Sequence, residues 1–263
     1  MKSNTILDFF APEAAQAIEA RRQALVRLGK VSAGFALASM PVLHLIEDAY
    51  AQSSSDVVGV LNFALTLEYL EESYFRQGLA TSGLLSGANR VVFEQIRRHE
   101  DEHVRLLRGA IQGAGGTPVT LTDANFNFSA GGFNPFSDLQ LFLALAQGFE
   151  DTGVRAYKGQ AAALSNGSGR PNPTLTVALQ IHSVEARHAS KVRRMRGEKG
   201  WIVQNQTTIP SAFSAIYAGE QNTTQGGVDV RTVTSIDANA VTESFDEILT
   251  REQVLAIAGP FIR

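Results

Sequence analysis

Two stretches of the chain decide the fold: IRRHEDEHVRLL, residues 96–107, and IHSVEARHASKV, residues 181–192. Each contains a glutamate followed three residues later by a histidine, namely Glu100 with His103 and Glu185 with His188. Residues three apart lie on the same face of an α-helix, so each pair can direct both side chains to one point. Apolar residues recur at helical spacing on either side of both pairs, which predicts that the pairs face a buried core.

Two further glutamates occupy matching positions on two other apolar stripes. Glu68 lies in LNFALTLEYLEESYF, residues 61–75, and Glu150 lies in QGFEDTGVRAYKG, residues 147–159. Glu68 precedes the first Glu-x-x-His pair by nearly the same distance as Glu150 precedes the second. The chain therefore repeats one pattern, a glutamate and then Glu-x-x-His. This repeat predicts two similar half-sites around a pseudo-twofold axis.

Four segments show the period of long helices, which are expected at residues 56–80, 89–112, 137–164 and 174–196. The connection between the first two segments is a short Gly/Ser turn, and the connection between the last two is a short stretch of Gly, Ser, Asn and Pro. Both suit antiparallel hairpins. Residues 113–135 form a much longer connection, rich in Gly, Asn and Phe. We therefore expect an all-α fold, a four-helix bundle of two hairpins joined by a long crossover.

Four glutamates in one core would repel one another, and a buried charge without a partner is costly. Two divalent cations would offset four carboxylates, and neutral imidazoles would complete the ligand set. A glutamate from each of two helices with a Glu-x-x-His from each of the other two is the ligand pattern of dimetal carboxylate bundles. The predicted metal ligands are Glu68, Glu100, His103, Glu150, Glu185 and His188.

The types of ligand also restrict the metal. The chain has no cysteine, so disulfides and thiolate sites are excluded. Carboxylates with imidazoles suit iron or manganese and tolerate zinc. We expect two iron or two manganese ions as cofactors, and the residue types do not discriminate between these two metals.

Several neighbouring polar residues have more than one interpretation. Tyr157 lies one heptad after Glu150 and is either a hydrogen-bond donor to a ligand carboxylate, next to the metals, or an ordinary core tyrosine. Phe75, its counterpart after Glu68, cannot donate. His99 and His182 are either partners of the ligands or surface and packing residues. Among the remaining glutamates, Glu72 lies one turn after Glu68, where it could serve the site, and is expected at the polar edge of its stripe. Glu71, Glu94 and Glu102 fall off the stripes and are expected in solvent.

An alternative motif overlaps the first pair. Residues 99–103 fit H-E-x-x-H, in which His99 and His103 would bind zinc and Glu100 would be the base of a metalloprotease. That interpretation gives no reason for the glutamates and the histidine on the other three stripes. It also needs a third ligand on a protease scaffold, and the sequence shows no strand-rich half. The dimetal interpretation accounts for more of the chain.

The quoted segments, together with FDEILTREQVLAIAGPFI at residues 245–262, resemble the ferritin-like superfamily. Within it, the chain is similar to the exported ferritin-like proteins often labelled desiccation-related. The resemblance covers residues 56–196 and the tail. It implies an oxo-bridged or hydroxo-bridged di-iron or dimanganese centre in a ferritin-like four-helix bundle, and it leaves the reaction open.

The N-terminal region resembles a twin-arginine export signal. Arg21 and Arg22 precede a mildly apolar stretch at residues 31–43, and residues 49–51 give a small-x-small cleavage pattern. Ala24, where a large apolar residue is usual, departs from the pattern, and an amphipathic helix is the alternative. We expect an exported, periplasmic protein. Its expected parts are a signal at residues 1–51, the bundle at residues 52–200 and a C-terminal extension at residues 201–263.

The C-terminal extension is less regular than the bundle. Thr250 and Gln253 are spaced as a capping box, which predicts a short terminal helix through Ala258. Gly259 and Pro260 follow as a stop signal.

Composition and site chemistry restrict the function. The net charge of −3 and the pI near 6.0 do not suggest a nucleic-acid binder, and the apolar N-terminal stretch is too short for a stable membrane span. A homo-oligomer is compatible with the sequence. A buried centre should admit only a small oxidant, dioxygen or peroxide, or Fe(II). We expect redox chemistry of the ferroxidase, peroxidase or catalase-like kind in stress protection; the alternative is a non-catalytic stress protein whose metals are structural.

Overall fold

The structure is a computed structural model and describes residues 57–129, 132–165 and 173–263. The predicted export signal at residues 1–51, the predicted cap Asp56 and most of the connection before the fourth long helix lie outside these ranges.

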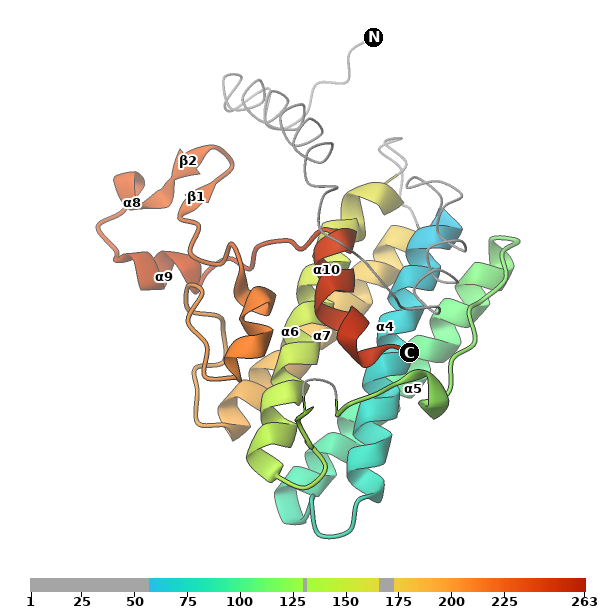
Figure 1. The fold of residues 1–263 in the computed structure, drawn as a ribbon. Helices are drawn as coiled ribbons and strands as arrows, with labels where there is room; N and C mark the ends of the chain where they lie inside the picture. The colour runs from blue at the N-terminus through green and yellow to red at the C-terminus, as the bar shows by residue number, and fades with distance from the viewer. Residues whose placement is uncertain (1–56, 130–131, 166–172) are drawn as a thin grey trace.

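Four long helices form the bundle, as the periodicity predicts (Figure 1). They are α4 (Val57–Ala80), α5 (Gly87–Gly113), α6 (Leu139–Leu164) and α7 (Pro173–Met195). Helix α4 packs on α5, α6 packs on α7, and the two hairpins meet mainly through α4 and α6. The expected all-α fold is confirmed.

Local signals explain where the helices begin and end. Asp138 caps α6, because its side chain accepts a hydrogen bond from the Leu141 amide at 2.8 Å. Helix α7 ends in a basic turn with Arg193 and Arg194, where cations stabilise the carbonyl end of a helix. Gly197 follows with a φ of 81°, a left-handed conformation that favours glycine.

The two pairs of helices differ in burial. Helices α5 and α7 bury one face each, as predicted, and their outer faces are exposed. Helices α4 and α6 are buried nearly all round, so the prediction of a single apolar stripe was wrong for them. The reason is that α4 and α6 contact each other as well as their hairpin partners, and α10 (Arg251–Ala258) packs on α6 from outside.

The crossover is held against the bundle and the chain end. The Asn62 side chain accepts from the Val119 amide at 2.8 Å and donates to the Thr117 carbonyl at 3.1 Å. After the 3-10 turn η1 (Asp123–Asn125), Phe126 forms an isolated antiparallel bridge with Ile262. The crossover and the C-terminus therefore stabilise each other on the same side of the bundle.

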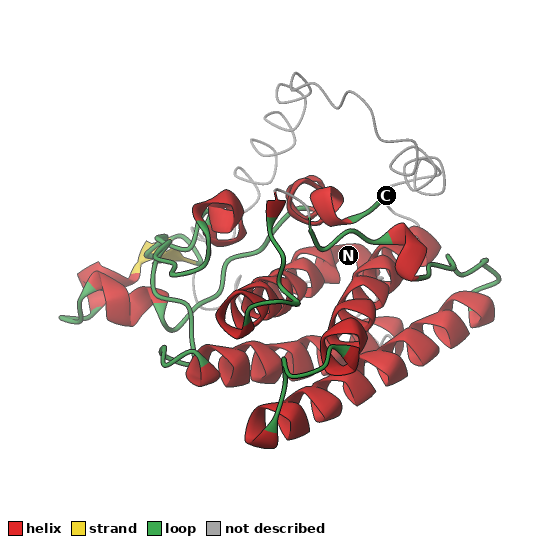
Figure 2. Cartoon of the chain, turned by 60° about the horizontal axis from the view of Figure 1, so that its bottom comes forward, coloured by secondary structure: helices red, strands yellow, loops and turns green. Residues whose placement is uncertain are grey.

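The C-terminal extension consists of short elements (Figure 2). They are η3 (Ser211–Tyr217), β1 (Thr224–Gln225), β2 (Val228–Asp229), α8 (Val230–Val233), α9 (Ala238–Thr242), α10 and η4 (Gly259–Phe261). The predicted capping box is present at α10: the Gln253 amide donates to Thr250 Oγ1 at 3.3 Å, and the Thr250 amide donates to Gln253 Oε1 at 2.8 Å.

The extension is locked onto α6 by close and polar contacts. Arg155 is fully buried, and its Nε lies 2.8 Å from Glu220 Oε1 and from the Glu247 carbonyl. Gly159 lets the extension approach, because a Cβ there would lie 2.0 Å from the Leu249 carbonyl oxygen. In the described ranges, no helix has the length and apolar character that crossing a membrane requires.

Candidate metal centre

The structure brings the six predicted ligands together in the middle of the bundle. Two groups of potential ligand atoms form, each with all its atoms within 4.8 Å of one another. The first contains Glu68, Glu100, His103 and Glu185, and the second contains Glu100, Glu150, Glu185 and His188. Glu100 and Glu185 belong to both groups, so their carboxylates lie between two adjacent points and are placed to bridge them.

Each imidazole directs Nδ1 toward the carboxylates. His103 Nδ1 lies 2.9 Å from Glu100 Oε2, 3.1 Å from Glu68 Oε2 and 3.2 Å from Glu185 Oε1. His188 Nδ1 lies 2.9 Å from Glu100 Oε1 and 3.3 Å from Glu150 Oε2. The Glu-x-x-His spacing thus delivers one carboxylate and one imidazole to the same point in both halves.

The four carboxylates are fully buried, and some of their oxygens lack hydrogen-bond donors. All four glutamates of the two groups have exposed fractions of 0%. Among the residues that the structure describes, Glu150 Oε1 and Glu185 Oε2 have no hydrogen-bond donor, and the other oxygen of each carboxylate faces only an imidazole nitrogen at 3.2–3.3 Å. Buried polar atoms normally have partners, so these oxygens call for a ligand. Cations fit this donor set, because they would compensate the charge and coordinate the free oxygens.

Without cations, protonation of some glutamates would have to reduce the repulsion between the buried carboxylates. Burial raises the pKa of Glu68 to about 8, and the charge of Glu185 adds to the rise. Burial and the neighbouring carboxylates also raise the pKa values of Glu150 and Glu185. Burial opposes ionisation of Glu100 as well, but hydrogen bonds from His103 and His188 outweigh it and lower its pKa to about 2.

The same contacts act on the histidines. Burial disfavours the charged imidazoles, but the adjoining glutamates outweigh burial and raise the pKa values of His103 and His188. The metal-free centre therefore holds extra protons on both carboxylates and imidazoles, and a bound metal would displace them.

The prediction that Glu71 is solvated was wrong. Its exposed fraction is 3%, and burial, followed by the charges of Glu185 and Glu150, raises its pKa well above the usual value. Glu71 Oε1 and Glu185 Oε2 each lie 3.2 Å from the position that a Cβ on Gly153 would take. Gly153 and Glu71 occupy equivalent positions in the repeat, each three residues after a glutamate ligand candidate, Glu150 or Glu68. Because Gly153 has no side chain, the Glu71 carboxylate of the other half has room beside it.

Glu71 belongs to neither group of converging ligand atoms, but its carboxylate adjoins them. The sequence did not predict the burial of Glu71, because α6 and the C-terminal extension cover the side of α4 on which it lies. The pattern of apolar residues within α4 does not show this cover. The available signal was its spacing of three residues from Glu68, the same spacing that places each histidine beside a glutamate.

Tyr157 contacts the centre. Its hydroxyl donates a hydrogen bond to Glu68 Oε1, across the bundle from α6 to α4. Its repeat counterpart Phe75 is fully buried and packs against Phe93, with ring centroids 5.5 Å apart. Of the two repeat counterparts, Glu68 therefore receives a phenol hydrogen bond, whereas Glu150 has no equivalent donor among the described residues.

His99 contacts Nε2 of His188, the ring nitrogen that does not face the carboxylates. His99 Nδ1 lies 2.8 Å from His188 Nε2, and the two rings stack with centroids 5.1 Å apart. Burial and the neighbouring His188 lower the pKa of His99. A partner of this kind fixes the orientation and tautomer of a ligating imidazole. His99 belongs to neither group of ligand atoms, so the described residues do not form the two-histidine zinc pair of the protease motif.

The remaining polar residues behave as expected. Glu72 is largely buried at the edge of its stripe and pairs with Arg76 at 3.1 Å. Glu94 pairs with Arg90 at 2.8 Å, and Glu102 pairs with Arg105 at 2.6 Å, both at the surface. His182 is half-buried, and burial followed by Lys158 lowers its pKa. Among the described residues, it is part of neither ligand group.

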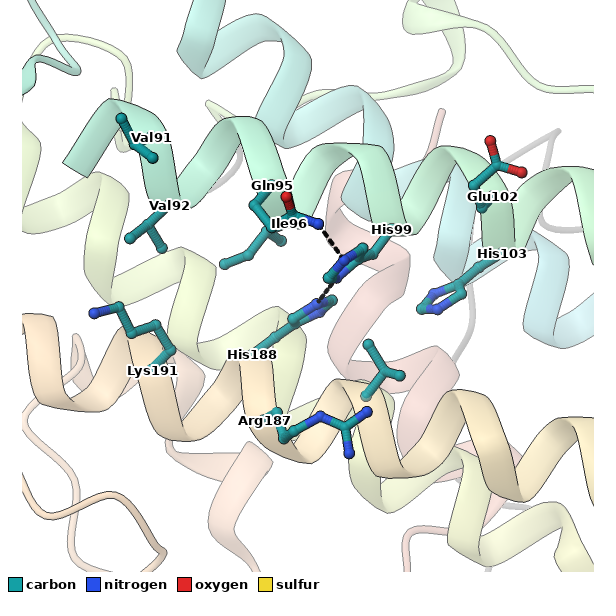
Figure 3. Close-up of a pocket in the computed structure, with 11 residues that line it drawn as sticks. Val91, Val92, Gln95, Ile96, His99, Glu102, His103, Arg187, His188 and Lys191 are labelled. Carbon is teal, nitrogen blue, oxygen red and sulfur yellow. Dashed lines mark hydrogen bonds between the residues drawn. The ribbon is translucent and has the colours of Figure 1, made fainter. Parts of the chain in front are cut away.

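A surface pocket that the sequence did not predict borders two of the converging residues. The carboxylates are fully buried, but His103 and His188 border a pocket of about 640 Å³ between α5 and α7 (Figure 3). The outer faces of these two helices are not covered by the extension. The pocket therefore reaches the imidazoles of the centre from the surface.

A family model agrees with this arrangement. The model described as ferritin-like domain matches residues 56–198, a range that includes all four long helices and all six converging ligands. Among curated proteins, none matches the chain.

Proposed function

The chain belongs to the family of ferritin-like domain proteins, and from this premise we propose that its bundle holds two iron or two manganese ions for redox chemistry with dioxygen or peroxide. One observation carries the proposal: the two overlapping groups of buried glutamates and histidines, in which Glu150 Oε1 and Glu185 Oε2 lack hydrogen-bond donors in the described ranges. Two divalent ions match the charge of four carboxylates, and oxygen ligands with imidazole suit both metals.

The protein's own residues would orient and protect such a centre. Glu100 and Glu185 would bridge, Glu68 with His103 and Glu150 with His188 would complete the two ends, and Glu71 would add a fifth carboxylate beside Glu185. The bound metals would supply the change of valence that reduces a small oxidant. The resulting activity would be ferroxidase, peroxidase or catalase-like, and stress protection is the role that we propose for it.

Two neighbours would hold protons at defined atoms. Tyr157 keeps its proton, because burial and the adjoining Glu68 raise its pKa well above the usual value, so it remains a donor to Glu68 Oε1. His188 would present Nδ1 to a metal only if its proton sits on Nε2, and His99 Nδ1 is placed to accept that proton's hydrogen bond. Apolar residues of the neighbouring core cluster, such as Leu65, Leu107 and Ile181, keep bulk water from the carboxylates.

The test is to load the purified protein with Fe(II) or Mn(II), add dioxygen or peroxide, and follow oxidant loss and metal valence. Glu100→Ala and Glu185→Ala should abolish turnover, while the exposed Glu102→Ala should not. A second outcome would favour the alternative function, a non-catalytic stress protein. In that case the metals would bind and stabilise the bundle, but the wild type would consume no oxidant.

Export remains a separate proposal that rests on residues 1–51. We propose that the twin arginine Arg21–Arg22 directs the chain to the periplasm, a route that would let the bundle bind its metals before export. Replacing both arginines with lysine should leave the precursor in the cytoplasm. Export of that double variant at the wild-type level would contradict the proposal.

A further inference from the structure

The pocket between α5 and α7 has the size and lining of a site for an organic molecule. Its volume of about 640 Å³ falls in the range of small-molecule pockets. Apolar walls come from both helices, with Val91, Val92 and Ile96 on α5 and Val184 on α7. Dioxygen or peroxide would occupy only a small part of this space.

The inner side of the pocket is made of imidazoles. Figure 3 shows the His99 and His188 rings meeting between the two helices, with His103 farther along α5. His103 and His188 direct their Nδ1 atoms to the buried carboxylates, so the pocket and the candidate metal centre share these two rings. A molecule in the pocket would lie directly over the ligands of the centre.

The rim of the pocket carries two cations that pair with no acidic residue in the described part of the chain. Arg187 and Lys191 line it, and neither forms an ion pair with another described residue. Glu102, the acidic residue of the rim, is already paired with Arg105 at 2.6 Å. Figure 3 shows Lys191 on the Val92 side of His188 and Arg187 on the other side. The rim therefore presents positive charge beside apolar walls, a combination that attracts an amphipathic anion.

We propose that this pocket binds a small organic acid, with its acidic group at Arg187 and Lys191 and its apolar body on Val92, Ile96 and Val184. The inference deepens the proposed function, because a molecule bound there would be placed as a co-substrate of the metal centre. Binding itself requires only the pocket, so it can be tested without any turnover.

The probes are octanoate and 2-naphthoate, titrated calorimetrically into the full chain with and without bound metal. Both pair one carboxylate with an apolar body, flexible in one case and rigid in the other. Octan-1-ol and octylammonium have the same chain without the negative charge. We expect at least one of the two acids to bind at least tenfold more tightly than the alcohol and the amine, in the metal-free as well as the loaded protein.

Two variants address the pocket, each with a matched control. Arg187→Ala with Lys191→Ala should weaken binding of the acid by roughly tenfold or more, since hydrogen bonds to charged groups are the stronger ones. Arg231→Ala, an exposed cation on α8, should not weaken it. Val91→Trp, at a side chain that is 65% exposed, should block the pocket without disturbing the core, whereas Val233→Trp, at 70% exposed, should leave binding unchanged.

The outcomes separate the proposals. If metals load and oxidant is consumed but neither acid binds better than the alcohol, the pocket proposal fails and the proposed function stands. If an acid binds as predicted but no metal loads, the proposed function fails and the pocket remains a binding site. If the wild type is a dimer that Val91→Trp converts to a monomer, the groove is an interface between copies of the chain, and the organic-acid proposal is overturned.

Discussion

The two hairpins of the bundle carry the same ligands in different surroundings. Each contributes a glutamate and a Glu-x-x-His to the centre, at equivalent places in the repeat. Their neighbours are not repeated. The α4–α5 hairpin has Glu71, Phe75 and His99 at the positions where the α6–α7 hairpin has Gly153, Tyr157 and Val184.

This difference shows which positions of the two half-sites vary and which are the same. In the proposed function, the ligands are alike because both halves would bind the same kind of cation. The contacts around them differ, since Tyr157 donates to Glu68, His99 holds His188, and Glu71 fills the space that Gly153 leaves. Partners of metal ligands tune affinity, so the two ions should bind unequally.

The largest expected effect comes from removing a shared carboxylate, which breaks both halves at once. Glu185→Ala deletes an oxygen donor from each of the two groups. We expect this variant to lose both ions on dialysis. Metal analysis of the dialysed protein, freshly purified or refolded, measures the loss. Glu102→Ala is the control and should retain both ions. Retention of two ions by Glu185→Ala would contradict the shared role.

The second-largest effect is expected from variants that change only one of the two half-sites. Glu68→Gln removes a carboxylate from the first group alone, and Glu150→Gln removes one from the second group alone. Each variant should keep about one ion where the wild type binds two, because the shared carboxylates and one complete end remain. Metal analysis gives the stoichiometry. Loss of both ions from either variant would mean that the halves do not bind independently.

Metal removal should reverse the dependence of stability on pH. Glu68, with its pKa raised to about 8, and the two histidines with raised pKa values bind protons more tightly when folded. The contribution of Glu68 is complete below its unfolded pKa and is lost as pH rises toward 8. The contribution of the two histidines is complete below their unfolded pKa values and declines as pH rises from there through their raised folded pKa values. Each such group contributes about 1.4 kcal/mol per pH unit within its window.

The metal-free protein should therefore melt at a higher temperature at pH 6 than at pH 8. The loaded protein should melt higher at pH 8, because metal binding releases those protons. Glu100, with its pKa lowered to about 2, acts in the opposite direction only below about pH 4.5, outside this comparison. Thermal unfolding at the two pH values, with and without chelator, measures both slopes. Equal slopes would show that no metal competes with protons here.

Much of this comparison could be predicted from the sequence. The i, i+3 spacing and the repeated glutamate place six ligands on inward faces, because those relations are local to each helix. Glu71 and the all-round burial of α4 and α6 could not be predicted in this way. They depend on contacts between segments distant in the chain, chiefly α4 with α6 and then α10 with α6, and the pattern of each helix alone does not reveal these contacts.

The pocket was missed for a related reason. Val91 and Arg187 are exposed on separate helices, and nothing in either helix shows that the other lies opposite. His99 was recognised as a candidate partner of the ligands, but only the packing of α5 on α7 shows that it reaches His188.

A smaller effect is expected from making the halves alike. Tyr157→Phe gives both halves a phenylalanine at the matching position and removes the hydrogen bond to Glu68. Affinity for the ion beside Glu68 should fall about tenfold, the lower end of the range for partners of metal ligands, while the other ion is unaffected. Competition with a chelating dye would resolve the two affinities. An equal change in both would contradict the assignment of Tyr157 to one half.

The smallest effect is expected at Gly153. Gly153→Ala places a Cβ 3.2 Å from Glu71 Oε1 and from Glu185 Oε2, so one carboxylate must shift by a few tenths of an ångström. We expect a modest loss of metal affinity, with Glu71→Gln giving a loss of similar size. Gly109→Ala is the control, since a Cβ there has open space. If Gly153→Ala binds metal as well as that control does, Glu71 is not held against the centre.

The central claim is that two ions lie between the two halves. Anomalous diffraction from crystals of the iron-loaded or manganese-loaded protein, collected at the absorption edge of each metal, tests it most directly. We expect two peaks about 3.5–4 Å apart, the spacing of two-metal sites. One peak should lie among Glu68, Glu100, His103 and Glu185, and the other among Glu100, Glu150, Glu185 and His188. A single peak, or no peak within the bundle, would contradict it.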